Sequence, residues 1–222
     1  MRPVAVLRPE PGASATLARA RALALEAFAV PLFAVEPLAW TAPDPSAFDG
    51  LLLTSGNAIR HAGPELRKLH GLPVHAVGAA TAEAAAAAGL TVATVGTGGI
   101  EKLLGRLPPG LHLLHLCGEH RRSAEAWGGR VTPVPVYRSA AIASPPDLHR
   151  LEDAVALVHS PRAGRRLAQL VRRREQIAVA AISAVAGEAC GGGWQEIGVA
   201  EQPTDDAVLS LAASLCKRAD PE

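Results

Sequence analysis

Short apolar runs alternate with longer stretches rich in alanine and leucine along most of the chain. Six runs predict β-strands because nearly every position in them is apolar, and they are residues 4–7, 51–54, 74–77, 111–116, 154–159 and 177–182. A turn signal and a stretch long enough for a helix follow most of them. Strands without polar alternation are typical of parallel sheets covered by helices on both faces. The pattern therefore predicts an α/β fold class.

An internal repeat sharpens this prediction. The stretch FDGLLLTSGNAIR (48–60) aligns with EDAVALVHSPRAGR (152–165), and similar strand and helix patterns follow each copy. The N-terminal VAVLRPEPG (4–12) also resembles LLHLCGEHR (113–121). One strand of one copy therefore lies at the start of the chain, and the repeat is permuted.

The permuted repeat predicts two similar domains, one of them discontinuous. We expect residues 1–32 together with 141–222 to form the first α/β domain and residues 41–130 to form the second. Residues 33–40 and 131–140 would be the two crossings. Both are rich in β-forming residues and interrupted by prolines, which suits a two-stranded linker.

The strand-to-helix corner of each repeat predicts an anion site. Ser55 and Ser160 follow the strands and are favoured helix N-caps. The free amides of the next residues, at positions 56–58 and 162–163, would then lie at the carboxyl ends of parallel strands, where open α/β sheets bind ligands. Two such corners could hold one polyanionic ligand across a cleft. The alternative interpretation is that each serine only caps its helix.

The composition of the chain bears on its partners and its cellular compartment. Lys and Arg number 22 and Asp and Glu number 21, which gives a net charge of +1 and no general attraction to nucleic acid or membrane. Three scattered cysteines favour free thiols in a reducing compartment. The most apolar stretch, residues 22–40, contains two glutamates and two prolines. We therefore expect a cytoplasmic protein without membrane or nucleic-acid partners.

Other motifs give weaker signals. The chain lacks the phosphate-loop motif GxxxxGK[ST], which disfavours a nucleotide-dependent enzyme, and it also lacks GxSxG and HExxH. HLCGEH (115–120) offers two histidines and a cysteine, but no second ligand cluster accompanies it, so no metal is expected. The arginine-rich stretch 162–174 predicts a solvated helix face. Tyr137 is the only tyrosine and lies in a crossing segment, which leaves a proton-donor role open.

Taken in order, seven pieces of the chain resemble the uroporphyrinogen-III synthase family. They are VLRPEPG near the start, TSGNAI (54–59), VGAATAEAA (77–85), HLCGEHRR (115–122), PVYRS (135–139), HSPRAG (159–164) and AISAVAGEA (181–189). The resemblance implies two flavodoxin-like α/β domains joined by a two-stranded β linker. It also implies an enzyme that cyclises hydroxymethylbilane, a linear tetrapyrrole, with loss of water and inversion of ring D. No cofactor and no metal are implied.

The resemblance also implies the site residues. Tyr137 would be catalytic and help to protonate the leaving hydroxyl. The substrate-binding positions carried over are Arg8, Ser55, Asn57, Ala58, Gly78, Thr81, Gly118, Ser160 and Arg162. Ser183 and Val185 depart from the glycine and threonine of many relatives, so no binding threonine is carried over there. We expect a monomer that meets hydroxymethylbilane synthase transiently. The rival hypothesis is a non-catalytic two-domain protein that binds tetrapyrroles or polycarboxylates.

Overall fold

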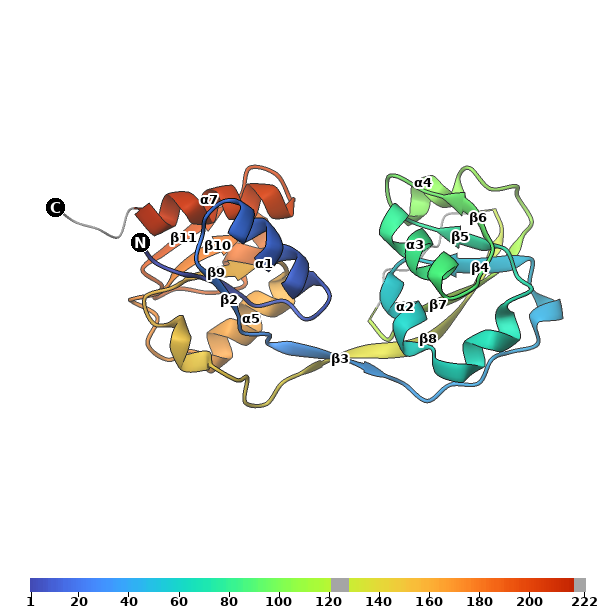
Figure 1. The fold of residues 1–222 in the computed structure, drawn as a ribbon, viewed down its shortest axis with the longest axis horizontal. Coiled ribbons are helices and arrows are strands. Elements are labelled where there is room, and N and C mark those ends of the chain that lie inside the picture. The colour runs from blue at the N-terminus through green and yellow to red at the C-terminus, as the bar shows by residue number, and fades with distance from the viewer. Residues whose placement is uncertain (121–127, 218–222) are drawn as a thin grey trace. The chain divides into compact units, whose positions relative to one another are not determined.

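The structure is a computed structural model that describes residues 1–120 and 128–217 (Figure 1). The chain divides into two compact units, of which unit 1 comprises residues 1–34 and 141–222 and unit 2 comprises residues 35–140. Each unit is built on one sheet whose described strand pairs are parallel, with helices against its faces. The predicted α/β class is thus confirmed.

Unit 1 has a five-stranded sheet in the order β11-β10-β9-β1-β2. Its strands are β1 (Val4–Val6), β2 (Ala27–Ala29), β9 (Val155–Val158), β10 (Ala178–Ala181) and β11 (Glu196–Val199). Its helices are α1 (Gly12–Ala22), α5 (Pro161–Leu170), α6 (Ala184–Glu188), α7 (Asp205–Lys217) and the 3-10 turn Leu148–Leu151. α1 and α7 pack on one face of the sheet, and α5 and α6 pack on the other (Figure 1).

The central strands of unit 1 have uniformly apolar sequences because they are buried on both faces of the sheet. Every residue of β1, β9 and β10 is buried, because helices cover both sides of these strands. The edge strand β11 instead alternates between partly buried and exposed residues. The sequence did not predict β2, which is only three residues long and lies inside a longer apolar stretch.

Unit 2 has a six-stranded sheet in the order β3-β8-β7-β4-β5-β6. Its strands are β3 (Phe33–Pro37), β4 (Gly50–Leu53), β5 (Val74–Ala76), β6 (Val92–Val95), β7 (His112–Gly118) and β8 (Arg130–Ala141). Its helices are α2 (Gly56–His61), α3 (Ala79–Ala87), α4 (Ile100–Leu104) and the 3-10 segments Pro45–Ala47 and Gly63–Leu69. The chain passes between the units within β3 and again at the end of β8.

The strands of the two repeats occupy equivalent positions in their sheets. The order β2-β1-β9-β10-β11 in unit 1 corresponds to β8-β7-β4-β5-β6 in unit 2. Thus β1, from the start of the chain, takes the place that β7 takes in the other sheet. The carboxyl ends of β1 and β9 in unit 1, and of β7, β4 and β5 in unit 2, carry the predicted binding residues, and Tyr137 lies within β8.

The arginine-rich stretch differs from its prediction. α5 ends at Leu170, so Arg172 and Arg173 do not belong to a helix face. Arg166 donates to the carbonyl oxygens of Ile142 and Ala143 at 2.6 and 3.2 Å, which ties α5 to the chain that enters unit 1. The predicted solvated face is thus only partly correct: Arg165 is exposed on α5, Arg172 and Arg173 are exposed beyond its end, and Arg166 satisfies backbone carbonyls.

None of the helices in the described part of the chain combines the length and the apolar character that a membrane crossing needs.

Candidate functional site

Tyr137 and Gly118 lie side by side at the carboxyl end of β7. The two residues are register partners, and the amide of Glu119 donates to the Tyr137 carbonyl at 2.9 Å. A Cβ atom at position 118 would lie 3.0 Å from ring atoms Cε2 and Cζ of Tyr137 and 3.2 Å from its hydroxyl oxygen. The glycine therefore gives the phenol room to lie directly against the strand.

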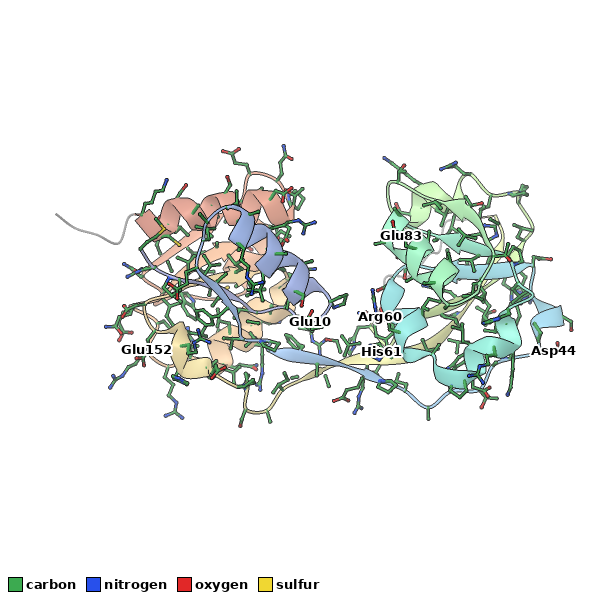
Figure 2. All side chains as sticks on the ribbon, in the orientation of Figure 1. Glu10, Asp44, Arg60, His61, Glu83 and Glu152 are labelled. Carbon is green, nitrogen blue, oxygen red and sulfur yellow. The ribbon has the colours of Figure 1, made fainter. Side chains whose placement is uncertain are left out.

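The other side of the phenol faces α2. The His61 ring lies 6.1 Å from the Tyr137 ring, centroid to centroid, at a tilt of 37°. Burial, and secondarily the neighbouring Arg60, lower the pKa of His61, so the imidazole is mostly neutral at pH 7. Arg60 donates to the Asn57 side-chain oxygen at 3.2 Å, and Figure 2 labels Arg60 and His61 on this short helix.

Tyr137 also lines a cavity of about 250 Å³ in unit 2. The cavity is lined by Thr54, Val77, Ile100, His115, Gly118, His120 and Tyr137. Within it, the Thr54 hydroxyl and Nε2 of His115 are hydrogen-bonded at 3.1 Å, and His115 is only 3% exposed. The cavity thus combines aromatic, aliphatic and hydrogen-bonding groups at the strand ends.

Sequence reasoning considered His115 only as a metal ligand, together with Cys117 and His120. In the structure Cys117 is buried, and His115 bonds to Thr54. Among residues 1–120 and 128–217, no three His, Cys, Asp or Glu side chains gather closely enough to hold a metal ion. Arg121 and Arg122, which end the motif HLCGEHRR, lie outside the described residues.

The helix N-termini of unit 2 differ from one another in their caps. Ser55 caps α2 by accepting a hydrogen bond from the Asn57 amide at 3.2 Å, and the Ala58 amide bonds to the Ser55 carbonyl at 3.1 Å. The predicted free amides of Asn57 and Ala58 are therefore occupied, and the Ala58 side chain is buried in the core. That part of the prediction was wrong, because the capping serine uses the amides itself.

α3 begins differently. Its N-cap is Gly78, which has no side chain to cap the first turn. The Thr81 amide bonds back to the Gly78 carbonyl at 3.1 Å, and the Thr81 side chain is nearly buried. The start of α3 is thus a helix N-terminus with no side-chain cap, next to the strand end of β5.

The corner at Ser160 in unit 1 repeats the serine cap. The Ser160 hydroxyl accepts a hydrogen bond from the Ala163 amide at 3.1 Å, so the predicted free amide of Ala163 is also occupied. The Arg162 guanidinium carbon lies 4.3 Å from the centroid of the Phe33 ring. Ser183 caps α6 in the same way, through the Ala186 amide at 3.4 Å.

Arg8 belongs to a charged network that the sequence did not reveal. Asp205, at the start of α7, accepts hydrogen bonds from Thr16 at 2.9 Å, Arg19 at 2.7 Å, His159 at 2.7 Å and Arg8 at 3.4 Å. We call these five residues the Asp205 cluster. Arg8 was predicted as a substrate-binding cation, but one arm of its guanidinium is already paired with a carboxylate.

The Asp205 cluster has a defined protonation state. Burial would raise the pKa of Asp205, but hydrogen bonds from His159, Thr16 and Arg19 outweigh burial and lower it. Burial lowers the pKa of His159, which its hydrogen bond to Asp205 only partly offsets. Asp205 is thus a carboxylate and His159 a neutral donor near pH 7.

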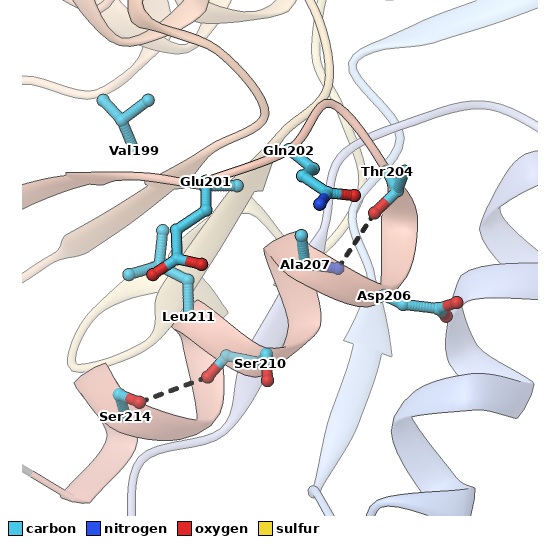
Figure 3. Close-up of a pocket in the computed structure, with 10 residues that line it drawn as sticks. Val199, Glu201, Gln202, Thr204, Asp206, Ala207, Ser210, Leu211 and Ser214 are labelled. Carbon is cyan, nitrogen blue, oxygen red and sulfur yellow. Dashed lines mark hydrogen bonds between the residues drawn. The ribbon is translucent and has the colours of Figure 1, made fainter.

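A larger cavity, of about 740 Å³, lies in unit 1 between β11 and α7 (Figure 3). Glu201 and Asp206 are among its lining residues, and none of the lining side chains is basic. An acidic cavity would repel a polycarboxylate. The cavity beside Tyr137 is smaller, but it is therefore the better candidate for binding the polycarboxylate substrate that the sequence predicts.

The fold and site together define an α/β protein of the kind that binds ligands at the carboxyl ends of parallel strands. The sequence profile described as uroporphyrinogen-III synthase HemD matches residues 14–210. The chain therefore belongs to the uroporphyrinogen-III synthase family, and it is a cyclising lyase of porphyrin biosynthesis. No curated protein sequence matches the chain.

Two solved structures are similar to this chain over nearly its full length. A uroporphyrinogen-III synthetase from Helicobacter pylori 26695 is 18% identical, with 97% of this chain and 100% of that chain covered and a TM-score of 0.66. A mutant uroporphyrinogen III synthase from the extremely thermophilic bacterium Thermus thermophilus is 21% identical, with 96% and 99% covered and a TM-score of 0.50. At these identities the likeness supports the fold alone.

Proposed function

We propose that this enzyme cyclises hydroxymethylbilane, with loss of water and inversion of ring D, to give uroporphyrinogen III. The observation that carries the proposal is the placement of Tyr137 against Gly118 in a strand-end cavity of unit 2. The family profile supports it, because it matches residues 14–210.

Tyr137 acts in the first step as the proton donor to the leaving hydroxyl. Hydroxide is a poor leaving group, and a positioned general acid typically contributes about 10²–10⁴ in rate. Departure of water leaves an electrophilic azafulvene at the exocyclic methylene carbon, and ring D supplies the electron pair that forms the new bond to this carbon. The enzyme then holds the linear tetrapyrrole so that ring D closes through its substituted carbon. This is control by proximity and orientation.

The carboxylates of the substrate bind at helix N-termini and strand ends. The proposed binding residues are Arg8, Ser55, Asn57, Ala58, Gly78, Thr81, Gly118, Ser160 and Arg162. Gly78 is the best supported of these, because no side chain caps α3 and a helix N-terminus attracts anions. Arg8 has less support because its guanidinium is paired with Asp205. Ala58 has less support because its side chain is buried in the core.

The two units are flavodoxin-like domains joined by a two-stranded β linker. Counted within unit 1, the strand order is 2-1-3-4-5, which is the flavodoxin order. The domains comprise residues 1–32 with 141–222 and residues 41–130, and the linker comprises residues 33–40 and 131–140.

The enzyme works as a cytoplasmic monomer without a cofactor or metal, and it receives its substrate through transient contact with hydroxymethylbilane synthase. Three buried cysteines support a reducing compartment.

A coupled assay tests the proposal. Porphobilinogen and hydroxymethylbilane synthase supply the substrate, the products are oxidised, and the type I and type III uroporphyrins are separated by chromatography. Type III product that depends on this protein is expected. Only type I, as in the blank, together with tight polycarboxylate binding would instead favour the non-catalytic binding protein.

A further inference from the structure

His115 is a polar residue at a position where the fold accepts leucine. It pairs in register with Leu52 of β4, and Leu113 lies two residues before it on the same face of β7. Leu52 and Leu113 pack in the apolar cluster under α4. Burial of a polar group costs free energy unless the group is hydrogen-bonded. Core packing alone therefore does not explain a histidine at this position, and a specific reason is needed.

Thr54 provides that reason. It follows β4 directly, and its hydroxyl is hydrogen-bonded to Nε2 of His115 at 3.1 Å. Both residues line the cavity that Tyr137 also lines. A threonine hydroxyl has one donor and two acceptor sites, so one bond to the imidazole leaves Thr54 able to bond a ligand. The buried imidazole holds the Thr54 hydroxyl oxygen in place.

The remaining walls suit a flat ring. Val77 and Ile100 are aliphatic lining residues of the cavity. The volume of about 250 Å³ equals roughly eight waters at about 30 Å³ each and lies below the usual 300–1,000 Å³ of drug-sized pockets. A cavity of this size accommodates one substituted ring, and the rest of a tetrapyrrole would extend out of it.

We propose that this cavity is a subsite for a single pyrrole ring, in which Thr54 bonds the ring and His115 is the positioning residue that orients Thr54. The inference rests on the proposed function and deepens it. The ring is the hydroxymethyl-bearing one, because Tyr137 lies on the same cavity and the hydroxyl must leave beside its proton donor. The aliphatic walls contact the ring faces.

Binding of porphobilinogen, a monopyrrole, tests the subsite without turnover. We expect porphobilinogen to shift the imidazole NMR signals of His115 in the wild-type protein. Thr54→Val keeps the side-chain shape but removes the hydroxyl, and it should weaken binding about tenfold, or about 1.4 kcal/mol. Thr54→Ser restores the hydroxyl and should recover most of that loss.

Two further variants complete the design. His115→Leu replaces a buried polar group by a residue that the same face already uses, so the fold should survive while binding weakens. His75→Gln is the matched control, because His75 is a buried strand histidine in register with Leu52 but is not among the lining residues of the cavity. It should bind porphobilinogen as the wild type does.

The proposal is overturned if porphobilinogen leaves the His115 signals unmoved, or if Thr54→Val binds it as tightly as the wild type. The type III assay of the wild type tests the proposed function separately. Type III formation with unchanged KM in Thr54→Val would refute the subsite and leave the function standing. Only type I product with the wild type, as in the blank, would refute the function, and the porphobilinogen titration would still decide the subsite.

Discussion

A carboxylate placed at Gly78 should stabilise the protein and weaken substrate binding at the same time. Gly78 has φ −155° and ψ 163°, close to the φ −158° and ψ 162° of the capping residue Ser183. A Cβ at position 78 would meet no atom within 4 Å. Gly78→Asp can therefore cap α3 without strain, as Ser183 caps α6.

The expected sizes follow from this geometry. Replacing a glycine at a compatible position contributes about 0.4–1 kcal/mol through the unfolded state. A negative charge at a helix N-terminus contributes about 0.3–1 kcal/mol more. The free energy of unfolding should thus rise by about 0.7–2 kcal/mol. Repulsion of a substrate carboxylate about 4 Å away costs about 1 kcal/mol or more, which raises KM at least about fivefold.

Thermal unfolding and steady-state kinetics measure the two effects. Gly71→Asp is the matched control, because Gly71 is exposed, has open space around its Cβ position and does not begin a helix. It adds the same charge to unit 2 and should leave KM unchanged. Added salt should lower KM in Gly78→Asp by screening the repulsion. A stabilised Gly78→Asp protein with wild-type KM would refute the anion site at α3.

Three further predictions concern Tyr137, its neighbour and the Asp205 cluster. Tyr137→Phe keeps the ring and should lower kcat about 10²-fold or more with an unchanged melting temperature; normal turnover would exclude the acid role. Gly118→Ala brings a Cβ to 3.0 Å from the Tyr137 ring and should cost about 1–3 kcal/mol of stability and also lower kcat, whereas full turnover would show that the close contact is unimportant. Burial lowers the pKa of His159 below its usual 6.5, so the unfolded chain binds more protons as the pH falls below 6.5, and stability should decrease there. His159→Gln should flatten this slope of melting temperature against pH, and an unaltered slope would contradict the assignment.

The sequence predicted the parallel strands well, because burial on both faces leaves a continuous apolar run. The predicted strand 154–159 contains the observed β9, Val155–Val158, and the predicted strand 177–182 contains β10, Ala178–Ala181. Ser55 and Ser160 were predicted as N-caps and are confirmed, since capping depends on the residues next in sequence.

Contacts between residues far apart in sequence could not be predicted. Arg8 and Asp205 are 197 positions apart, and nothing local in either segment indicates their pairing. Thr54 and His115 are 61 positions apart and meet only because β4 and β7 are neighbours in the sheet. The free amides were predicted wrongly for a local reason, because the N-cap that marks the site also occupies its donors.

The most direct test of ring inversion by this enzyme is the type III fraction of the product as a function of protein concentration. Hydroxymethylbilane is added directly, and spontaneous closure to the type I isomer competes with the enzyme. If the enzyme inverts ring D, the type III fraction rises with wild-type concentration until type III dominates. A fraction that stays at the level of the protein-free blank would contradict ring inversion by this enzyme.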